Sequence, residues 1–95
     1  MPVRNCSKTI ATAILSIINQ TYESWLLYVV DDGSIDDTYK ILCKFSDRRI
    51  MVRRYEQSKG IAIRLNELIE CVTTPYIARM DGDDIAFPDR LETQL

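Results

Sequence analysis

The sequence contains no histidine, and its three cysteines, Cys6, Cys43 and Cys71, lie far apart. Without histidine, no Ser-His or Cys-His pair can activate a nucleophile, so any general base must be a carboxylate or must come from outside this chain. Because no CxxC spacing is present, zinc sites and thiol redox motifs are not expected. We expect the cysteines to be buried free thiols in a reducing compartment.

The sequence also lacks an excess of positive charge and a long apolar run. Its 12 Lys and Arg stand against 14 Asp and Glu, a balance that argues against a nucleic-acid partner. The longest apolar stretch, Ile10 to Ile18, is interrupted by Thr12 and Ser16 and falls short of the roughly 18 residues of a membrane span. No apolar signal core opens the sequence, so we expect a cytoplasmic location, with peripheral membrane association possible for a longer protein.

Helical and strand-like segments alternate along the 95 residues, without a linker or a repeat. We expect helices over residues 8–19, 36–45, 61–72 and 88–95, with Ser7 and Ser34 as caps of the first two. Strands are expected over residues 25–30, 50–55 and 76–80. This alternation predicts an α/β fold with a parallel sheet flanked by helices, whose ligands bind at the carboxyl ends of the strands.

One element of such a fold is not expected to form. A strand should precede the first helix, but residues 1–6 are too few for a strand of typical length and hold a single branched aliphatic residue, Val3. The last helical pattern also runs to the final residue, Leu95. We therefore interpret residues 1–95 as one incomplete domain, truncated at both ends.

Acidic residues follow two of the strand-like runs. Asp31 and Asp32 end the first run, and Asp81, Asp83 and Asp84 end the last. Two unit charges about 4 Å apart repel by roughly 4 kcal/mol at an effective dielectric constant of about 20. A divalent cation, or a ligand with many hydroxyl and amide donors, would offset this repulsion. The clusters therefore indicate a binding site for a metal-bound nucleotide.

Each cluster also has a plainer interpretation. In the second, Gly82 lets a ligand approach between two carboxylates, and Mg²⁺ or Mn²⁺ prefers such oxygen ligands; Asp83 and Asp84 would otherwise only cap a turn. In the first, Asp31 or Asp32 would accept a hydrogen bond from a base N–H group, or Asp32 would only cap the next helix.

Several motifs, taken in order along the chain, resemble those of family 2 glycosyltransferases with the GT-A fold. They are Pro2-Val3-Arg4-Asn5, Ser16-Ile17-Ile18-Asn19-Gln20-Thr21, Val30-Asp31-Asp32-Gly33-Ser34 with Asp36 and Thr38, Lys59-Gly60 with Asn66, and Asp81-Gly82-Asp83-Asp84 with Pro88 and Arg90-Leu91. The resemblance implies a partial Rossmann-like sheet and the part of an enzyme that binds a nucleotide-diphosphate sugar.

The resemblance also implies roles for individual residues. It places Pro2 and Val3 in the wall of the nucleotide pocket, Asp31 or Asp32 on the base, Lys59 on the base or phosphates, Asp81 on the ribose or sugar, and Asp83 on an Mg²⁺ or Mn²⁺ ion at the diphosphate. A lysine that only begins a helix at the surface is the alternative for Lys59. The parent enzyme would transfer a sugar, with inversion, to an acceptor hydroxyl on a saccharide or a lipid-linked molecule.

The chain departs from the family pattern at Arg4, where an aromatic residue is common, and at Ser58, where asparagine is usual. No catalytic residue is assigned, because in this family the carboxylate base lies in a later part of the enzyme. Two alternatives remain open: an inactive truncated remnant, and a receiver-like domain whose aspartates hold Mg²⁺ and accept a phosphoryl group.

Overall fold

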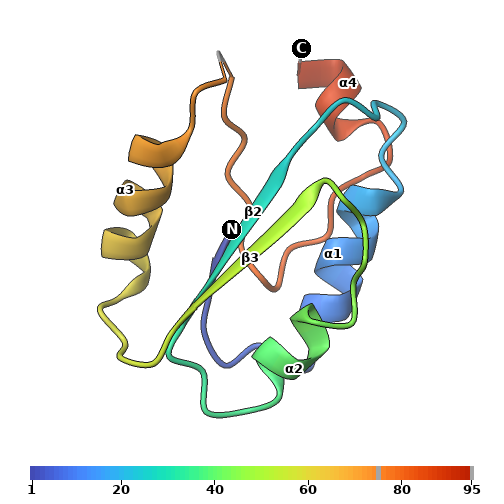
Figure 1. Cartoon of the computed structure of the whole chain (residues 1–95). Helices are drawn as coiled ribbons and strands as arrows, with labels where there is room; N and C mark the ends of the chain where they lie inside the picture. The colour runs from blue at the N-terminus through green and yellow to red at the C-terminus, as the bar shows by residue number, and fades with distance from the viewer. Residues whose placement is uncertain (75, 95) are drawn as a thin grey trace.

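The computed structural model describes residues 1–74 and 76–94 and shows an α/β arrangement (Figure 1). The elements in chain order are β1 (Pro2–Val3), α1 (Ile10–Ile18), β2 (Leu27–Asp32), α2 (Thr38–Leu42), β3 (Ile50–Tyr55), α3 (Ile61–Cys71) and α4 (Arg90–Gln94). Figure 1 shows α1 and α2 on one side of the strands and α3 on the other. The predicted fold class is confirmed.

The three strands form a parallel sheet in the order β1-β2-β3. The central strand β2 pairs along its whole length with β3, from Leu27 opposite Ile50 to Asp32 opposite Tyr55. It extends two residues further than the sequence predicts, so Asp31 and Asp32 belong to the strand itself rather than to the turn after it. This extension places the two carboxylates on opposite faces of the sheet, where both are fully buried.

The expectation that no strand precedes α1 is wrong. Pro2 and Val3 form β1 and pair in parallel with Val30 and Asp31 of β2. The backbone N–H of Val30 donates to the carbonyl of Met1 at 3.0 Å. Two residues suffice here because β2 presents a full row of backbone groups on that side, and Val3 is buried with only 2% of its surface exposed.

The strand expected over residues 76–80 does not form. This segment has no regular secondary structure, and Tyr76 and Ile77 are exposed. A strand needs a paired neighbour to satisfy its backbone groups, and β1 offers an edge of only two residues, one of which, Pro2, has no N–H group. Because β1 is so short, residues 76–80 have no strand with which to pair.

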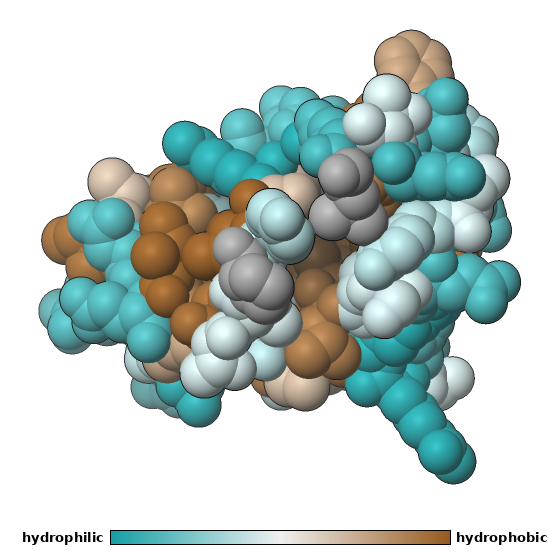
Figure 2. Space-filling model, turned by 90° about the horizontal axis from the view of Figure 1, so that it is seen from above, coloured by the Kyte–Doolittle hydropathy of each residue, from teal (hydrophilic) through white to brown (hydrophobic). Residues whose placement is uncertain are grey.

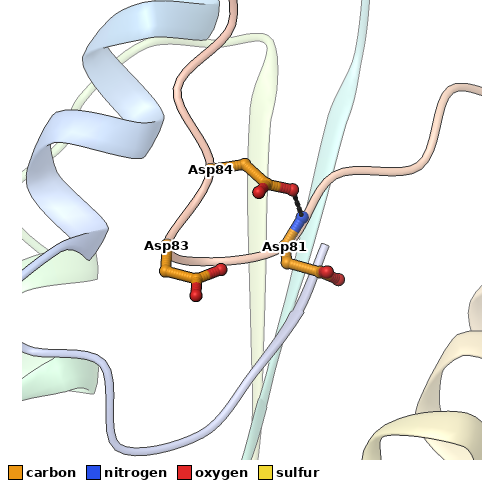
Figure 3. A group of neighbouring side chains, drawn as sticks. All are labelled: Asp81, Asp83 and Asp84. Atoms are coloured by element: carbon orange, nitrogen blue, oxygen red, sulfur yellow. Dashed lines mark hydrogen bonds between the residues drawn. The ribbon is translucent and has the colours of Figure 1, made fainter.

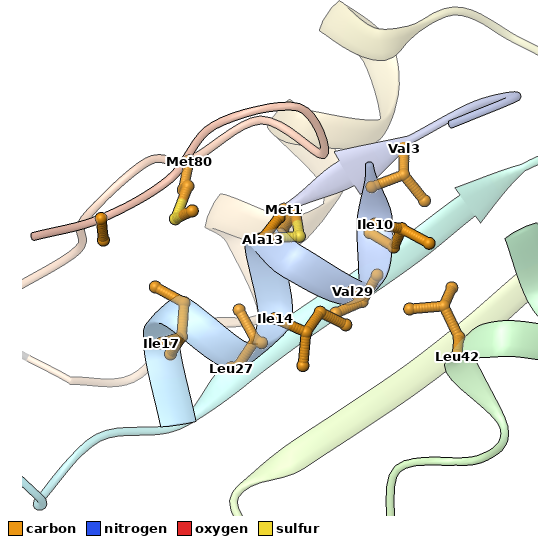
Figure 4. Close-up of a cluster of buried hydrophobic side chains, with 11 residues drawn as sticks. Met1, Val3, Ile10, Ala13, Ile14, Ile17, Leu27, Val29, Leu42 and Met80 are labelled. Atoms are coloured by element: carbon orange, nitrogen blue, oxygen red, sulfur yellow. The ribbon is translucent and has the colours of Figure 1, made fainter. Parts of the chain in front are cut away.

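The core lies between α1 and the sheet (Figure 4). The buried residues of α1 are Ile10, Ala13, Ile14 and Ile17, the spacing of one helical face. They pack with Val3, Leu27 and Val29 of the strands, Leu42 of α2, and Met80. Burying each large aliphatic side chain contributes about 1.5–3 kcal/mol, so this face holds the helix against the strands.

Helices α1, α2 and α4 begin later than the sequence predicts, whereas α3 begins at Ile61 as predicted. Thr9 rather than Ser7 is the N-cap of α1, and Asp37 rather than Ser34 is that of α2. Ser34 is instead used across the fold, because its hydroxyl oxygen accepts the backbone N–H of Asn5 at 2.9 Å. The long-range bond joins the segments after β1 and β2, which places the two strand ends side by side.

The opposite face of the sheet is less completely covered. A groove of about 200 Å³ lies between α3 and the strands β2 and β3, with Tyr28, Met51 and Leu68 in its lining. Viewed from above, the molecule shows apolar residues gathered around a hollow (Figure 2).

Cys43 and Cys71 are exposed, which contradicts the expected burial, whereas Cys6 is half-buried.

No helix among residues 1–74 and 76–94 is long and apolar enough to cross a membrane.

The C-terminal part of the chain is fastened to the end of α1 by Gln20, which is 5% exposed. Its amide nitrogen donates to the carbonyl of Phe87 at 2.7 Å, and its amide oxygen accepts the backbone N–H of Leu91 at 3.0 Å. The backbone N–H of Thr21 donates to the carbonyl of Pro88 at 2.7 Å. These bonds give a structural role to Gln20 and Thr21, the last two residues of the family-like motif that begins at Ser16.

We expect Gln20→Ala to lower the free energy of unfolding by about 1–3 kcal/mol, because two backbone groups of the α4 segment lose their partner. Urea unfolding followed by circular dichroism measures the change. Gln57→Ala is the matched control, since Gln57 is exposed and only its backbone carbonyl is used. Equal stability of the two variants would contradict a fastening role for Gln20.

Candidate functional site

A cavity of about 670 Å³ lies at the carboxyl end of β1. Its lining consists of residues 2–9, Asp36, Ile61, Arg79 and residues 81–83. The volume is within the range of about 300–1,000 Å³ typical of small-molecule sites, and its position agrees with the rule that ligands of parallel sheets bind beyond the carboxyl ends of the strands. Four of the predicted site residues, Pro2, Val3, Asp81 and Asp83, line it.

The acidic loop at this cavity is formed by Asp81, Gly82, Asp83 and Asp84 (Figure 3). A carboxylate oxygen from each of the three aspartates lies within 4.8 Å of the others. Asp84 caps the loop, because its carboxylate accepts the backbone N–H of Asp81 at 2.9 Å. Asp83 is exposed and Asp81 half-buried. Asp81 and Asp83 line the cavity, and Asp84 is not among its lining residues.

Gly82 holds this loop against β1. A Cβ atom at this position would lie 2.8 Å from the Sγ atom of Cys6 and 2.9 Å from the Cγ1 atom of Val3, closer than real Cβ contacts. The hydroxyl of Thr9 also donates to the carbonyl of Gly82 at 2.9 Å. The absence of a side chain is thus required for close packing, which fixes the positions of the flanking carboxylates.

The carboxylate of Asp81 has a cationic neighbour, because the guanidinium of Arg79 lies 3.6 Å away. Both side chains are about half exposed. Solvent screens such a pair, so Arg79 shifts the local charge balance more than it stabilises the fold.

Asp31 is fully buried in β2, opposite Val3 of β1. One of its carboxylate oxygens accepts the backbone N–H of Ser34 at 3.2 Å. The other has no hydrogen-bond partner among the described residues, and the nearest cation, the Nε atom of Arg54, is 4.0 Å away. A buried carboxylate oxygen without a donor is costly, so Asp31 keeps the capacity to accept one further hydrogen bond.

Asp32 is also fully buried, but both of its oxygens are engaged. One oxygen accepts the backbone N–H of Lys59 at 2.8 Å and the Nε–H of Arg64 at 2.9 Å. The other accepts the hydroxyl of Ser58 at 2.8 Å and the backbone N–H of Gly60 at 2.9 Å. Burial by itself would raise the pKa of Asp32, but these four donors outweigh it and hold the pKa well below its ordinary value.

Arg64 completes this network from the first turns of α3. Its side chain is 2% exposed, its Nη2 group donates to the carbonyl of Gln57 at 2.9 Å, and its guanidinium stacks on the ring of Tyr55 at 3.7 Å from the centroid. The sequence alone gives Arg64 no buried role, since a helical arginine is usually solvated. Its spacing, four residues after Gly60 at the start of the helix, is the only signal that could have indicated an inward-pointing side chain.

The two acidic clusters, Asp31–Asp32 and Asp81–Asp84, do not line the same cavity. Asp31, Asp32 and Lys59 are absent from the residues that line the cavity, although Asp31 lies directly across from the lining residue Val3. The reason is that β2 runs on through Asp32, so that the two side chains point to opposite faces of the sheet and are both fully buried there. Lys59 contributes its backbone N–H to Asp32, and its side chain is exposed.

The whole chain, residues 1–95, matches the model of glycosyl transferase family 2, and the chain belongs to this family. It is 39% identical over 95 residues to UDP-Glc:alpha-D-GlcNAc-diphosphoundecaprenol beta-1,3-glucosyltransferase WfgD of Escherichia coli, covering all of this chain and 38% of that protein. It is 37% identical over 93 residues to chondroitin synthase of Escherichia coli, covering 97% of this chain and 14% of the synthase. The chain thus spans little more than a third of the length of the curated relatives that match it in full.

The fold is shared with solved structures of TarS from S. aureus. Two of them, residues 1–349 alone and in complex with UDP, superpose with a TM-score of 0.89 at 24% identity, covering 98% of this chain and 29% of each 1–349 chain. The likeness confirms the predicted GT-A arrangement.

We expect the free energy of unfolding to fall as the pH drops below about 4. The folded Asp32 carboxylate keeps its charge at a pH where the unfolded one, with an ordinary pKa of about 3.9, takes up a proton, so its contribution is present above this pH and is lost below it. Asp36 acts in the same direction, because the hydroxyl and backbone N–H of Thr38 and the backbone N–H of Ser7 lower its pKa to about 2.

Urea unfolding at pH 7, 5, 4 and 3 measures this dependence. Asp32→Asn should lower stability at pH 7 by about 3 kcal/mol, because it removes the buried partner of Arg64 and leaves only the ion pair with the partly exposed Glu67 at 3.1 Å, and it should flatten the pH profile. If that variant does not fold, Asp36→Asn still tests the sign through a smaller flattening. Asp89→Asn, at an exposed position, is the control and should leave the profile unchanged.

We expect Gly82→Ala to destabilise the protein by about 1–3 kcal/mol through overpacking against Cys6 and Val3. Cys6→Ala removes the nearer of the two obstructing atoms, so the double variant should recover part of the loss. Thermal unfolding of the wild type, both single variants and the double variant measures the coupling. Strictly additive losses would show that the loop does not pack as described.

Proposed function

We propose that this chain is the donor-binding part of a glycosyltransferase that takes its sugar from a nucleotide-diphosphate donor. The observation that carries the proposal is the single cavity at the carboxyl end of β1, which combines an apolar wall from Pro2 and Val3 with the carboxylates of Asp81 and Asp83. The apolar wall suits a nucleoside, and the carboxylates suit its hydroxyl groups and a diphosphate-bound cation.

Family membership supports this proposal, as do the names of the relatives. WfgD is named for a UDP-Glc donor, and one solved structure of TarS is a complex with UDP. Neither name assigns a base or a sugar to this chain. The shared family and the position of the cavity at the sheet edge favour a donor of the same chemical class, a nucleoside diphosphate linked to a sugar.

The acidic loop fits a divalent metal ion. Its donors are all carboxylate oxygens, which hard cations such as Mg²⁺ and Mn²⁺ prefer, and the three aspartates bring oxygens within 4.8 Å of one another. We propose that Asp83 holds the ion and that Asp81 binds the ribose or sugar, while Asp84 keeps its capping bond. Such an ion would neutralise negative charge that develops on the departing diphosphate.

In the proposed reaction, the acceptor hydroxyl oxygen attacks the anomeric carbon with inversion. A bond from this oxygen to the sugar forms as the bond to the nucleoside diphosphate breaks, and the hydroxyl proton passes to a carboxylate base that none of the residues described here supplies. The residues of this chain bind and orient the donor. The acceptor is a saccharide or a lipid-linked molecule, and the reaction takes place in the cytoplasm or at its membrane surface.

The contact with the base is proposed for Asp31 or Asp32. Asp31 has the oxygen without a partner, whereas Asp32 would have to exchange a donor from the Ser58–Lys59–Gly60 segment for the base N–H group. Membership of glycosyl transferase family 2 argues against the receiver-like alternative. We propose that residues 1–95 bind the donor and do not transfer the sugar alone.

Calorimetric titration of the full chain with UDP in the presence of Mn²⁺ tests the donor site. We expect metal-dependent binding in the wild type and a loss of at least tenfold in affinity in Asp81→Ala/Asp83→Ala, which removes both carboxylates that line the cavity.

A matched control is Glu70→Ala/Asp89→Ala, which removes two charges at exposed positions and leaves the acidic loop intact. It separates a specific site from a general loss of negative charge. Equal metal-dependent affinity in the wild type and in Asp81→Ala/Asp83→Ala would contradict the assignment.

A further inference from the structure

Positive charge is concentrated in one short stretch of this chain, residues 40–54. The stretch holds six of the 12 basic residues and one of the 14 acidic residues, although the whole chain has a net charge of −2. It runs from α2 through the connection to β3 and almost to the end of that strand. The remainder of the chain is therefore strongly acidic, with six basic residues against 13 acidic ones.

Five of the six basic side chains are exposed, and we call them the basic edge: Lys40, Lys44, Arg48, Arg53 and Arg54. The sixth, Arg49, is occupied within the protein. Its guanidinium pairs with Asp47 at 2.8 Å and lies over the ring of Trp25 at 3.7 Å from the centroid. Asp47, the one acidic residue of the stretch, is thereby neutralised.

The basic edge follows the outer strand of the sheet. β3 stands last in the strand order β1-β2-β3, and the chain enters it directly from α2 (Figure 1). The guanidinium of Arg54 lies over the ring of Tyr39 in α2 at 5.1 Å from the centroid, so the two elements meet beside Lys40. Arg53 leaves the strand on the opposite face, since successive residues of a strand alternate. The five cations therefore lie along one side of the molecule.

Neighbouring carboxylates do not cancel the charge of the basic edge at the surface. A carboxylate oxygen of Asp31 lies 4.0 Å from Arg54, but this aspartate is fully buried. Glu67 lines the same groove as Arg53 but is already paired with Arg64 at 3.1 Å. Among residues 1–74 and 76–94, no carboxylate lies within ion-pair distance of the other three cations of the edge. The edge thus presents positive charge to a partner.

A flat anionic surface fits this distribution of charge better than a long polyanion such as nucleic acid. A polyanion that extends around the molecule meets the acidic remainder and is repelled, whereas a lipid bilayer contacts one side only. Clusters of about four to eight Lys and Arg residues are typical of segments that bind anionic lipid headgroups. Met51, in β3 and 45% exposed, adds an apolar side chain next to the cations.

The pairing of the strands relates the basic edge to the cavity. The two arginines of β3 are level with Pro2 and Val3 of the cavity wall, because β2 pairs in parallel with both neighbours. Two strand spacings of about 4.8 Å separate them, which is about 10 Å across the sheet. A surface that contacts the basic edge therefore lies near the side of the molecule on which the cavity opens.

We propose that the basic edge docks this chain on a bilayer that contains anionic phospholipid, with β3 and α2 toward the headgroups. The ammonium and guanidinium groups donate hydrogen bonds to headgroup phosphates and are attracted by the negative surface potential. The attraction acts over a Debye length of about 8 Å at physiological ionic strength, so it is sensitive to salt. The docking does not require the donor site, so this inference and the proposed function can fail separately.

The test is flotation of the full chain with phosphatidylcholine vesicles that contain either no anionic lipid or about one-third phosphatidylglycerol, at about 0.1 M salt. We expect binding to the anionic vesicles only, with release at about 1 M salt, where the Debye length falls to about 3 Å. Lys44→Gln/Arg48→Gln should bind at least tenfold more weakly, because each basic residue near the surface contributes about fivefold. Its affinity for UDP in Mn²⁺ should equal that of the wild type.

The matched control is Arg79→Gln/Arg90→Gln, which removes two cations from the segment beside β1, at the other edge of the sheet. This variant should keep the vesicle affinity of the wild type, and thermal unfolding should confirm that both double variants are folded. Equal binding to vesicles without anionic lipid, equal losses in the two variants, or no vesicle binding at all would overturn the docking. Binding to double-stranded DNA as tight as to the anionic vesicles would also overturn it, in favour of a general polyanion surface. Each of these results leaves the donor site standing.

Discussion

The structure depends on one buried ion pair, between Asp32 at the end of the central strand and Arg64 on α3. Taking two charges out of water is expensive, and the pair is tolerated because both carboxylate oxygens receive two donors each. Three of the donors come from the chain that connects β3 to α3, and the fourth is Arg64 itself. A single carboxylate thus fixes where β2 ends, how the connection turns and where α3 begins.

The ion pair of Asp32 with Arg64 also explains why the neighbouring residues Asp31 and Asp32 differ in their hydrogen bonding. Asp32 is saturated by groups of the protein, whereas Asp31, one residue earlier, has an unpartnered oxygen and lies across the sheet from the cavity wall. Adjacent residues of a strand point to opposite faces, so two identical carboxylates meet different surroundings. Identity of side chain in the sequence therefore does not imply identity of role.

The alternation of apolar and helical segments was enough to predict the parallel sheet, the bounds of β3 and nearly those of α3. It failed where pairing decides the outcome: Pro2–Val3 form a strand because β2 offers an edge, and residues 76–80 do not because β1 offers too little. At the site, the cavity residues Pro2, Val3, Asp81 and Asp83 were predictable from motif order. The burial of Asp32 by Ser58, Gly60 and Arg64 was not, since it depends on a side chain that turns inward from a helix whose other charges are solvated.

The bonds from α1 to the C-terminal segment have a mechanical meaning. Thr9 at the start of α1 holds the carbonyl of Gly82, Ser16 near its end accepts the backbone N–H of Ala86, and Gln20 just beyond it holds Phe87. Helix α1 and its two ends thereby hold residues 82–87, a segment that has no strand pairing to keep it in place. The position of the acidic loop therefore depends on the position of α1. A substitution of a polar residue such as Thr9 would displace the carboxylates of the loop without contacting them directly.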